Sequence, residues 1–429
     1  MLRTTFISAA TVCCFVAAHG QTRPIDLAEV LRLAGADHLA VRDAEARAAL
    51  ANADAARASE WWLPDLNAGI AMHHLQGSAM NGDGRFFTDV DRASFQGGLG
   101  LNAAWRFGEG PINARAQRTE AEAMRLRTEA ERNTAALDAV NTYLDLIAAR
   151  AERSAYAQLA QRADSIAQQL DALVRNGLGY ESDLLQAQSG QLRMQAATMQ
   201  AEMQEAMLQA RLVAALGMDP ATVLLPTDTV LAPLALPGAD RTFTDRSAFL
   251  GVRPDVLSAR SGLLAAQQRK RATTTGLLLP ELRLATMGSY FGGVFDPLYP
   301  TWEINGWLQW RIPLSPLLGG GELQQANARI ALREVQLSRT EAEATAELRA
   351  AQEQLRIARE QVRVAAESRD LAQRAYDQTA ARMRLGTARP FEIVQAQEAL
   401  LQAELARVRA ITGYNKGQYA VVVGVGQQP

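Results

Sequence analysis

The pattern of apolar and polar positions predicts two unusually long helices. Residues 112–176 and residues 322–385 contain neither glycine nor proline, and both carry apolar residues three and four positions apart. At a rise of about 1.5 Å per residue, each helix would be roughly 95 Å long, whereas an ordinary helix has about 11–12 residues. Because so long a helix cannot fold back on a globular core, we expect it to pair along its length with other helices in an elongated coiled coil.

Before each long helix, apolar and polar residues alternate with the period of two that is typical of strands. The segments 64–107 and 280–312 each contain two such stretches, which we interpret as β-hairpins. In the first hairpin, we expect the Gly-, Asn- and Asp-rich residues 77–92 to form the connecting loop. One face of the predicted strands is apolar and strongly aromatic, and its members are Phe95, Leu99, Leu101, Trp105, Trp302, Ile304, Leu308 and Trp310.

The same order of elements occurs twice along the chain. The first repeat, residues 21–217, contains a helix, a hairpin, a long helix and a return helix over residues 181–216. The second repeat, residues 254–420, has the same elements and ends with a return helix over residues 390–419. One structural plan used twice explains these matches.

Three segments lie outside the repeats. Residues 1–20 combine an early arginine, an apolar run and small residues near the end, which is the pattern of a secretory signal peptide. Residues 218–253 contain four prolines, too many for a helix, and are predicted to form an irregular linker. Residues 421–429 are expected to form a C-terminal tail.

Composition argues against several classes of function. Both cysteines, Cys13 and Cys14, lie in the predicted signal peptide, and Val12 is too large for a lipoprotein cleavage site, so we expect neither disulfides nor lipidation. A net charge of −2 gives no general attraction to nucleic acid. With four histidines and no cysteine near them, we expect no metal site. We find no nucleotide-binding or Ser-His-Asp pattern, so we predict no cofactor and no enzymatic activity.

The apolar strands raise the question of what covers them. After the predicted signal peptide, the chain has no apolar run of the roughly 18 residues that a transmembrane helix needs. Strands enter a membrane only as a closed barrel, and the smallest such barrels have about eight strands. The four predicted strands of one chain are too few, so we expect three copies to build one barrel. The alternative is a soluble sheet that buries one face under the helices, because half-buried strands show the same alternation.

Short motifs recur in both halves of the chain. They are Leu63-Pro64-Asp65-Leu66 with Leu279-Pro280-Glu281-Leu282, the glycines Gly177 and Gly386, Asp183-Leu184-Leu185-Gln186-Ala187 with Glu392-Ile393-Val394-Gln395-Ala396, and Arg253-Pro254-Asp255 at the start of the second half. In their order and spacing, the chain resembles the TolC-like outer-membrane efflux protein family (outer membrane factors). The resemblance implies a mainly α fold with a small β part: a homotrimer with a twelve-stranded transmembrane β-barrel in the outer membrane, continued through the periplasm by a coiled-coil helical barrel.

The resemblance also implies partners and site residues. The duct would be joined by a periplasmic adaptor (membrane fusion) protein to an inner-membrane transporter. Glu392 and Gln395 match positions that narrow the tube, and Asp183 matches an acid tied to a neighbouring helix, for which Arg389 is a candidate partner. Without the resemblance, the sequence favours the interpretation of Glu392 as an ordinary exposed acid near a helix start. The expected adaptor-docking residues are Gly177, Leu178, Gly386 and Thr387, and the expected lipid-facing residues are Phe95, Leu101, Trp105, Trp302 and Trp310.

We therefore predict the outer-membrane exit duct of a tripartite efflux or type I secretion system, which acts as a passive conduit. The alternative function is that of a soluble periplasmic coiled-coil adaptor or scaffold, which would not need two aromatic strand hairpins. The sequence leaves open which pump family is served and whether the exported substrate is a drug, a metal, a solvent or a polypeptide.

Overall fold

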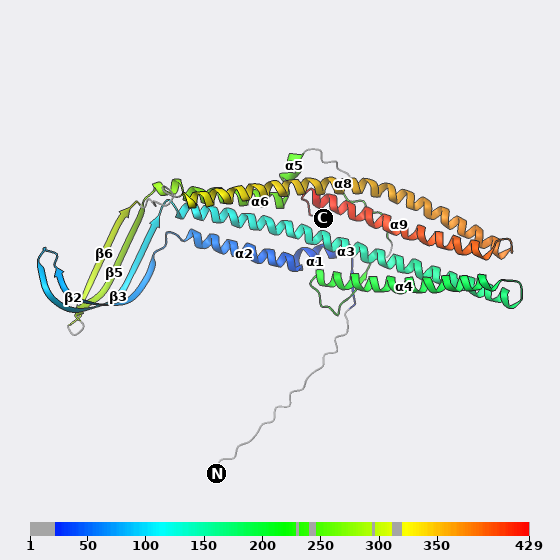
Figure 1. Ribbon diagram of the computed structural model, residues 1–429, viewed down its shortest axis with the longest axis horizontal. Coiled ribbons are helices and arrows are strands. Elements are labelled where there is room, and N and C mark those ends of the chain that lie inside the picture. Colours follow the sequence, from blue (N-terminus) through cyan, green and yellow to red (C-terminus); the bar gives the residue numbers. More distant parts are fainter. Residues whose placement is uncertain (1–21, 229–230, 240–245, 294–296, 311–319, 429) are drawn as a thin grey trace, which may run out of the picture. The chain divides into compact units, whose positions relative to one another are not determined.

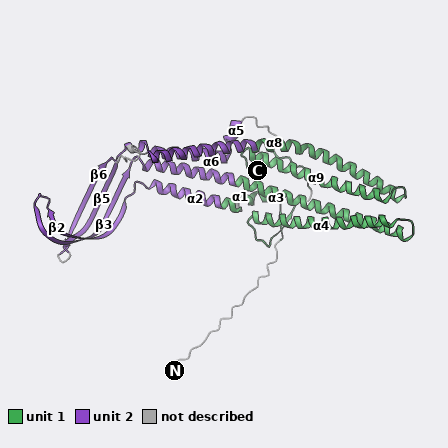
Figure 2. Ribbon diagram, viewed as in Figure 1, with its two compact units in different colours: residues 1–42, 132–242, 347–429 green, residues 43–131, 243–346 purple. Residues whose placement is uncertain are grey.

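The chain divides into two compact units (Figure 2). The computed structural model describes residues 22–228, 231–239, 246–293, 297–310 and 320–428 of the 429 residues. Unit 1 comprises Met1–Arg42, Arg132–Thr242 and Glu347–Pro429, and unit 2 comprises Asp43–Glu131 and Phe243–Ala346. The predicted signal peptide lies outside the described residues. A search of the described helices finds none that is both long and apolar enough to cross a membrane.

Long helices and a few strands make up both halves of the chain (Figure 1). The first half contains β1 (Thr22–Ile25), α1 (Leu27–Asp37), α2 (Leu39–Ser59), β2 (Asp65–Met80), β3 (Phe86–Arg106), α3 (Gly110–Arg175), α4 (Glu181–Ala215) and β4 (Val223–Pro226). The second half contains α5 (Arg246–Leu250), α6 (Pro254–Ala272), the 3₁₀ helix η1 (Thr275–Leu278), β5 (Glu281–Gly293), β6 (Tyr299–Gln309), α8 (Gly321–Arg384) and α9 (Pro390–Gly424). With 66 residues in α3 and 64 in α8, the predicted mainly helical fold with a small β part is confirmed.

The four strands of unit 2 form one antiparallel sheet in the order β2-β3-β5-β6. Leu66 pairs with Leu101, Leu101 with Thr286, and Thr286 with Ile304. Because directly opposed residues point to the same side of a sheet, this register gathers most of the large apolar residues of all four strands on one face and most of the polar residues on the other, although Met287, Phe291 and Trp307 lie on the polar face. The large members of the apolar face are Leu66, Ile70, Met72, Phe95, Leu99, Leu101, Trp105, Leu282, Trp302, Ile304 and Leu308.

The hairpin of β2 and β3 is longer than predicted. A loop is expected at residues 77–92, but the two strands leave only residues 81–85 between them. Asn81 holds this short turn, because its Oδ1 accepts hydrogen bonds from two backbone N–H groups of the turn. The glycines and acids that indicate a loop are accommodated by positive φ angles at Gly77 and Asp89 and by a register shift after Gly77. The loop prediction is therefore wrong for most of this segment, because bulges keep such residues within strands.

In unit 1, α3 packs along the predicted coiled-coil seam. Leu159 of α3 lies against Leu401 of α9. Further along, Ile166 packs with Ala187 of α4 and Ile393 of α9. Burying a large aliphatic side chain stabilises a fold by about 1.5–3 kcal/mol, so contacts of this kind along α3 hold the return helices in place.

The linker between the repeats is bound to α9 by two buried side-chain amides. Asn415 accepts a hydrogen bond from the backbone N–H of Leu234 (2.8 Å) and donates one to the Ala232 carbonyl (2.9 Å). Gln418 repeats the pattern with the N–H of Leu236 (2.9 Å) and the carbonyl of Leu234 (3.0 Å). The two side chains, 1% and 2% exposed, therefore hold this extended segment much as a neighbouring strand would.

Other parts of the linker also differ from the predicted irregular segment. β4 pairs in parallel with β1, and α5 forms a short helix. The hydroxyl of buried Tyr143 lies 2.7 Å from Asp228 Oδ2 and ties the linker to α3. Burial raises the pKa of Tyr143, so its hydroxyl stays protonated and donates this bond. At the other end, α9 extends past its predicted end at residue 419 to Gly424, because buried Val421 packs against Leu355 of α8.

Candidate functional site

The two hairpins of unit 1, α3–α4 and α8–α9, turn through the same backbone geometry. Gly177 and Gly386 have φ angles of +71° and +70°, a conformation that favours glycine at the end of a helix. In both turns, the residue after the glycine donates its backbone N–H to a helix carbonyl: Leu178 to Leu173, and Thr387 to Arg382, each at 2.9 Å. The internal repeat therefore extends to the turns.

Exposed apolar side chains surround both turns. Leu178 and Tyr180 are each 78% exposed next to the first turn, and Leu385 is 77% exposed beside the second. Phe391 follows in the first turn of α9 and is 47% exposed. Because water-exposed apolar groups of this size favour association with another surface, the turns are candidate contact sites.

Glu392 is held within its own hairpin. Its Oε2 lies 3.2 Å from a guanidinium nitrogen of Arg382, on α8, and its Oε1 accepts a hydrogen bond from the Arg389 backbone N–H at 3.3 Å. Arg382 also donates to the Thr387 carbonyl at 3.2 Å. These contacts, which we call the Arg382 clasp, join the end of α8 to the start of α9. The sequence prediction of the site did not include Arg382, because its position opposite Glu392 depends on the turn.

The other predicted gate residues are not drawn together in one chain. Asp183 is half-buried in the first turn of α4, and its carboxylate has no hydrogen bond or ion pair within the described residues, so Arg389 is not its partner here. Gln395 is exposed on α9. Met383 packs into the cluster around Ile166.

The two tips carry net charges of opposite sign. Residues 171–187 contain three acids and one arginine, whereas residues 380–396 contain three arginines and one acid. In the first tip, Arg175 pairs with Asp171 at 2.7 Å. In the second tip, Glu392 pairs with Arg382. The charged residues outside these two ion pairs are Glu181 and Asp183 on the first tip, and Arg384 and Arg389 on the second.

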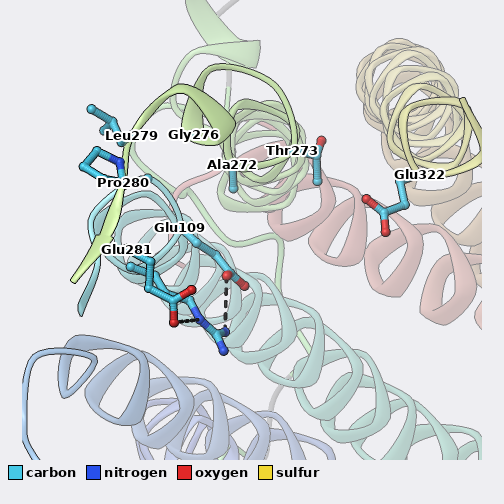
Figure 3. A pocket seen from close by; sticks show the side chains of 10 residues that line it. Glu109, Ala272, Thr273, Gly276, Leu279, Pro280, Glu281 and Glu322 are labelled. Carbon is cyan, nitrogen blue, oxygen red and sulfur yellow. Dashed lines mark hydrogen bonds and ion pairs between the residues drawn. The ribbon is translucent and has the colours of Figure 1, made fainter. Parts of the chain in front are cut away.

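In unit 2, a cavity of about 260 Å³ lies where the sheet meets the helices. Figure 3 shows Glu109, Glu281 and Glu322 around it. Arg106 lies 3.4 Å from Glu109 and 3.6 Å from Glu281, and Arg283 lies 2.8 Å from Glu281. The acids next to β3 and β5 are thus paired with arginines, and this cavity is part of the polar junction between strand and helix.

The backbone at this junction is tightly packed. A Cβ added at Gly108 would lie 1.8 Å from the Gly276 carbonyl oxygen, and one added at Gly276 would lie 2.4 Å from the Gly108 carbonyl oxygen. No side chain fits at either position without a backbone shift. Glycines in the sequence do not reveal this contact, because the two residues are far apart along the chain.

Aromatic residues also cluster beside the junction. The rings of Trp61 and Phe107 meet edge to face with centroids 6.1 Å apart. The indole nitrogen of Trp105 donates to the Trp62 carbonyl at 2.7 Å. Aromatic side chains with a polar handle suit the boundary between an apolar and an aqueous phase. Trp61 and Trp62 are not among the predicted residues, because they follow a helix and have no strand alternation.

Comparisons with known proteins agree with the fold. A family model described as outer membrane efflux protein matches residues 30–218 and 246–416. No curated protein sequence matches the chain. The chain is similar to the CmeC outer membrane channel of Campylobacter jejuni, with 20% identity and a TM-score of 0.79, covering 93% of this chain and 85% of that chain.

Two further solved structures show the same likeness. The outer membrane protein VceC of Vibrio cholerae has 19% identity and a TM-score of 0.76, covering 94% of this chain and 96% of that chain. The open state of the MtrE outer membrane channel of Neisseria gonorrhoeae has 16% identity and a TM-score of 0.75, covering 94% and 89%. These likenesses extend over nearly the whole chain and confirm the predicted fold.

Proposed function

Because this chain belongs to the outer membrane efflux protein family and is an outer-membrane exit duct and not a soluble adaptor, we propose that three copies assemble into one passive conduit. The observation that carries this proposal is that the described residues of a single copy leave two sheet edges and two apolar helix faces uncovered. Each edge and each face has a counterpart that only another copy supplies.

The sheet supplies the first pair of counterparts. Within the described residues, β2 and β6 are the outer strands, and each pairs on one side only. Unpaired backbone groups are not tolerated in the hydrocarbon of a membrane, so β2 of one copy pairs with β6 of the next. In this arrangement, the face that contains Phe95, Leu101, Trp105 and Trp302 meets lipid, as does Trp310 just after β6, and the face that contains Arg106 and Gln309 lines the lumen.

The second pair of counterparts is formed by the exposed apolar faces of α4 and α8 in unit 1. α4 exposes Leu192, Met199 and Met207, which are 60–67% exposed, and α8 exposes Ile357, Val364 and Leu371, which are 44–55% exposed. Counted from the ends of α4 and α8 at the tips, Leu192 and Leu371 both lie about 16–20 Å along the helix, and Met199 and Val364 about 27–30 Å. Apolar residues at matching heights, seven residues apart on α8 and seven to eight apart on α4, favour a coiled-coil seam between α4 of one copy and α8 of the next.

Disulfide cross-linking tests this assembly. The chain has no cysteine after residue 14, so Met199→Cys with Val364→Cys introduces the two thiols of the proposed seam into an otherwise cysteine-free background. We expect oxidation to give covalent dimers and trimers and nothing larger. Either single variant should stay monomeric on a denaturing gel, because position 199 would meet only position 364. Cross-linked species beyond three chains, or none with both cysteines present, would contradict the assembly.

At the tips, we propose that Glu392, Gln395, Asp183 and Arg389 form the narrow entrance of the duct. The opposite charges of the two tips support this role, because each α8–α9 tip attracts the α3–α4 tip beside it in a ring of three copies. Among the described residues, no side-chain ion pair engages Asp183 or Arg389, so both can make that contact. The exposed turns at Gly177-Leu178 and Gly386-Thr387 are the surfaces we assign to a periplasmic adaptor, through which an inner-membrane transporter delivers cargo.

A further inference from the structure

The junction between the sheet and the helices of unit 2 has two sides of different charge. On the side of the polar sheet face, the cavity of Figure 3 is lined by three acids, including Glu109 and Glu281, and by one arginine. On the opposite side, three exposed arginines lie in the helical turns next to the sheet: Arg115, Arg118 and Arg271. We call these three residues the arginine belt.

Helical geometry places Arg271 on the side of α6 that faces away from the cavity. Thr273, two residues later on the same helix, lines the cavity together with Arg106 of the polar sheet face. Residues two apart on a helix point about 200° apart, so the Arg271 side chain points away from the cavity. Leu264 and Gln267, which are also exposed, precede it at spacings of three and four and share its helix face.

Arg115 and Arg118 occupy the corresponding side of α3. Glu120, two residues after Arg118, lines a second hollow together with Gly262 of α6, and Gly262 lies three helical turns from Thr273, on the cavity side of that helix. Arg118 therefore points to the opposite side, and Arg115, three residues earlier, lies beside it on the surface of the helix.

The arginine belt makes no ion pair within the described residues. Arg118 donates one hydrogen bond to a hydroxyl group of α2 at 3.0 Å, and the other two guanidinium groups make no hydrogen bond there. The acid one turn further along α3, Glu122, is paired with Arg125 at 2.6 Å. At the end of α2, Arg57 and Glu60 are both exposed and offset one another in charge. The belt therefore keeps a net positive charge.

In the proposed ring of three copies, no neighbouring copy covers the belt. α3 is flanked by α2 and α6 of its own chain: one of its hydroxyl groups donates to the Ala44 carbonyl of α2, and Ser258 of α6 donates to its Ala123 carbonyl. α6 is flanked by α3 and α8, because Arg260 pairs with Glu341 of α8 at 2.8 Å. Copies that join through the outer flanks of this set of helices leave the belt exposed.

The belt lies at the depth of lipid headgroups. Arg115 and Arg118 follow the start of α3 by about 8 Å and 12 Å, and Arg271 lies one residue before the end of α6. The headgroup layer is roughly 5–8 Å thick on each side of a bilayer, and an arginine can extend its apolar stem to bring the guanidinium group into that layer. Trp62 and Leu278, at the junction itself, are 56% and 76% exposed and suit its apolar border.

We propose that the arginine belt binds the phosphate groups of anionic phospholipids in the periplasmic leaflet of the outer membrane. Guanidinium groups form strong charge-assisted hydrogen bonds with phosphate, and basic residues beside a membrane attract anionic lipids. The acyl chains of the same lipids cover the apolar face of the sheet. This proposal rests on the proposed orientation of that face toward lipid and goes beyond it, because it names the class of lipid that collects around the duct.

Electron spin resonance of spin-labelled lipids tests the proposal. The full-length protein is reconstituted in phosphatidylcholine vesicles with a trace of spin-labelled phosphatidylglycerol or phosphatidylcholine, and the motionally restricted component of the spectrum reports lipid in contact with protein. We expect the association constant of phosphatidylglycerol to be at least threefold that of phosphatidylcholine and the preference to fall as sodium chloride is raised. Equal constants would overturn the proposal. Absence of a restricted component for either lipid would contradict the lipid-facing sheet, and the proposal with it.

Matched variants locate the preference. The belt variant changes all three belt arginines to glutamine and should lose most of the preference for phosphatidylglycerol. The control variant removes the same charge at three exposed positions of unit 1 and should keep the preference: Arg42→Gln, Arg349→Gln and Arg374→Gln. Should the belt variant fail to fold, Arg115→Gln with Arg271→Gln suffices, since neither guanidinium group makes a hydrogen bond or ion pair in the described structure. An unchanged preference in the belt variants, or an equal loss in the control, would overturn the proposal.

Discussion

At the scale of single residues, the close packing of backbone at the strand–helix junction of unit 2 depends on two glycines. Gly108→Ala places a methyl group against the Gly276 carbonyl, so the backbone must shift. We expect a loss of about 1–3 kcal/mol in the free energy of unfolding, as for other overpacked sites. Gly69→Ala, in the middle of β2 with no atom within 4 Å of its added methyl group, is the control. Thermal melting of the purified variants checks this: equal melting temperatures would show that the junction relaxes freely.

The Arg382 clasp predicts opposite changes in ion selectivity for its two members. Arg382→Gln frees the Glu392 carboxylate and removes a positive charge, so the entrance should favour cations more than the parent does. Glu392→Gln leaves Arg382 without its partner, so selectivity should shift toward anions. Reversal potentials in planar bilayers under a salt gradient measure both. Shifts of the same sign, or none, would show that the clasp lies away from the ion path.

Single residues also mark the limit of what sequence reasoning predicts. Glu392 could be chosen as a gate residue only through the family resemblance, because an acid after a glycine turn is by itself ordinary at a helix start. Its partner Arg382 could not be chosen from the sequence, since the two residues pair only when the turn brings α8 and α9 side by side. The same holds for Gly108 and Gly276, which meet through the fold alone.

At the scale of elements, the amides of α9 fix the linker. Asn415→Leu removes two hydrogen bonds to the linker backbone and leaves the N–H of Leu234 and the carbonyl of Ala232 without these partners. Each unsatisfied buried group costs about 1–3 kcal/mol, so we expect the linker to detach locally and to be cleaved faster in limited proteolysis. Gln402→Leu, at an exposed position of the same helix, should be cleaved like the parent. Equal cleavage of all three proteins would mean that packing alone holds the linker.

The long helices should also respond to acid. Hydrogen bonds from Arg125, Arg356 and Arg363 lower the pKa values of Glu122, Glu353 and Glu360, each three residues earlier, below 4.5. A carboxyl group with a lowered pKa in the fold stabilises it above the unfolded pKa, and that stability is lost as the pH falls through the lowered value. The melting temperature followed by circular dichroism should therefore be flat near neutral pH and fall below about pH 4.5.

A variant isolates this effect of acid. In Arg356→Gln with Arg363→Gln, two of the three pairs are gone, so the fall in melting temperature on acidification should be smaller than in the parent. The same fall in both proteins would assign the acid response to other groups.

Elements differed in how well the sequence predicted them. The long helices were predictable because they lack glycine and proline and keep helical spacing over many turns. The extension of β2 and β3 into residues 77–92 was not predictable, because a bulge at Gly77 allows residues that are typical of loops to remain paired in the two strands. The pairing of β4 with β1 was also hidden, since strands of four residues carry almost no alternation.

At the scale of the whole molecule, the described residues of one chain leave sheet edges and apolar helix faces that further copies cover in the proposed assembly. The sequence indicated an assembly through a count of strands, and the structure adds a register that gathers most large apolar residues on one face of the sheet and most polar residues on the other. The sequence of α4 or of α8 alone does not show that their exposed apolar residues lie at similar distances from the tips. Those distances can be compared only once the structure of both hairpins is known.

Single-channel recording with cysteine block tests the central claim most directly, namely that three copies form a conduit lined by the polar face of the sheet. Asn305→Cys, on the polar face, and Ile304→Cys, its neighbour on the apolar face, are reconstituted in planar bilayers and treated with a water-soluble, charged thiol reagent. We predict discrete current steps from both proteins and block in three successive steps for Asn305→Cys alone. Absence of channels, or block through position 304 with none through position 305, would contradict the account.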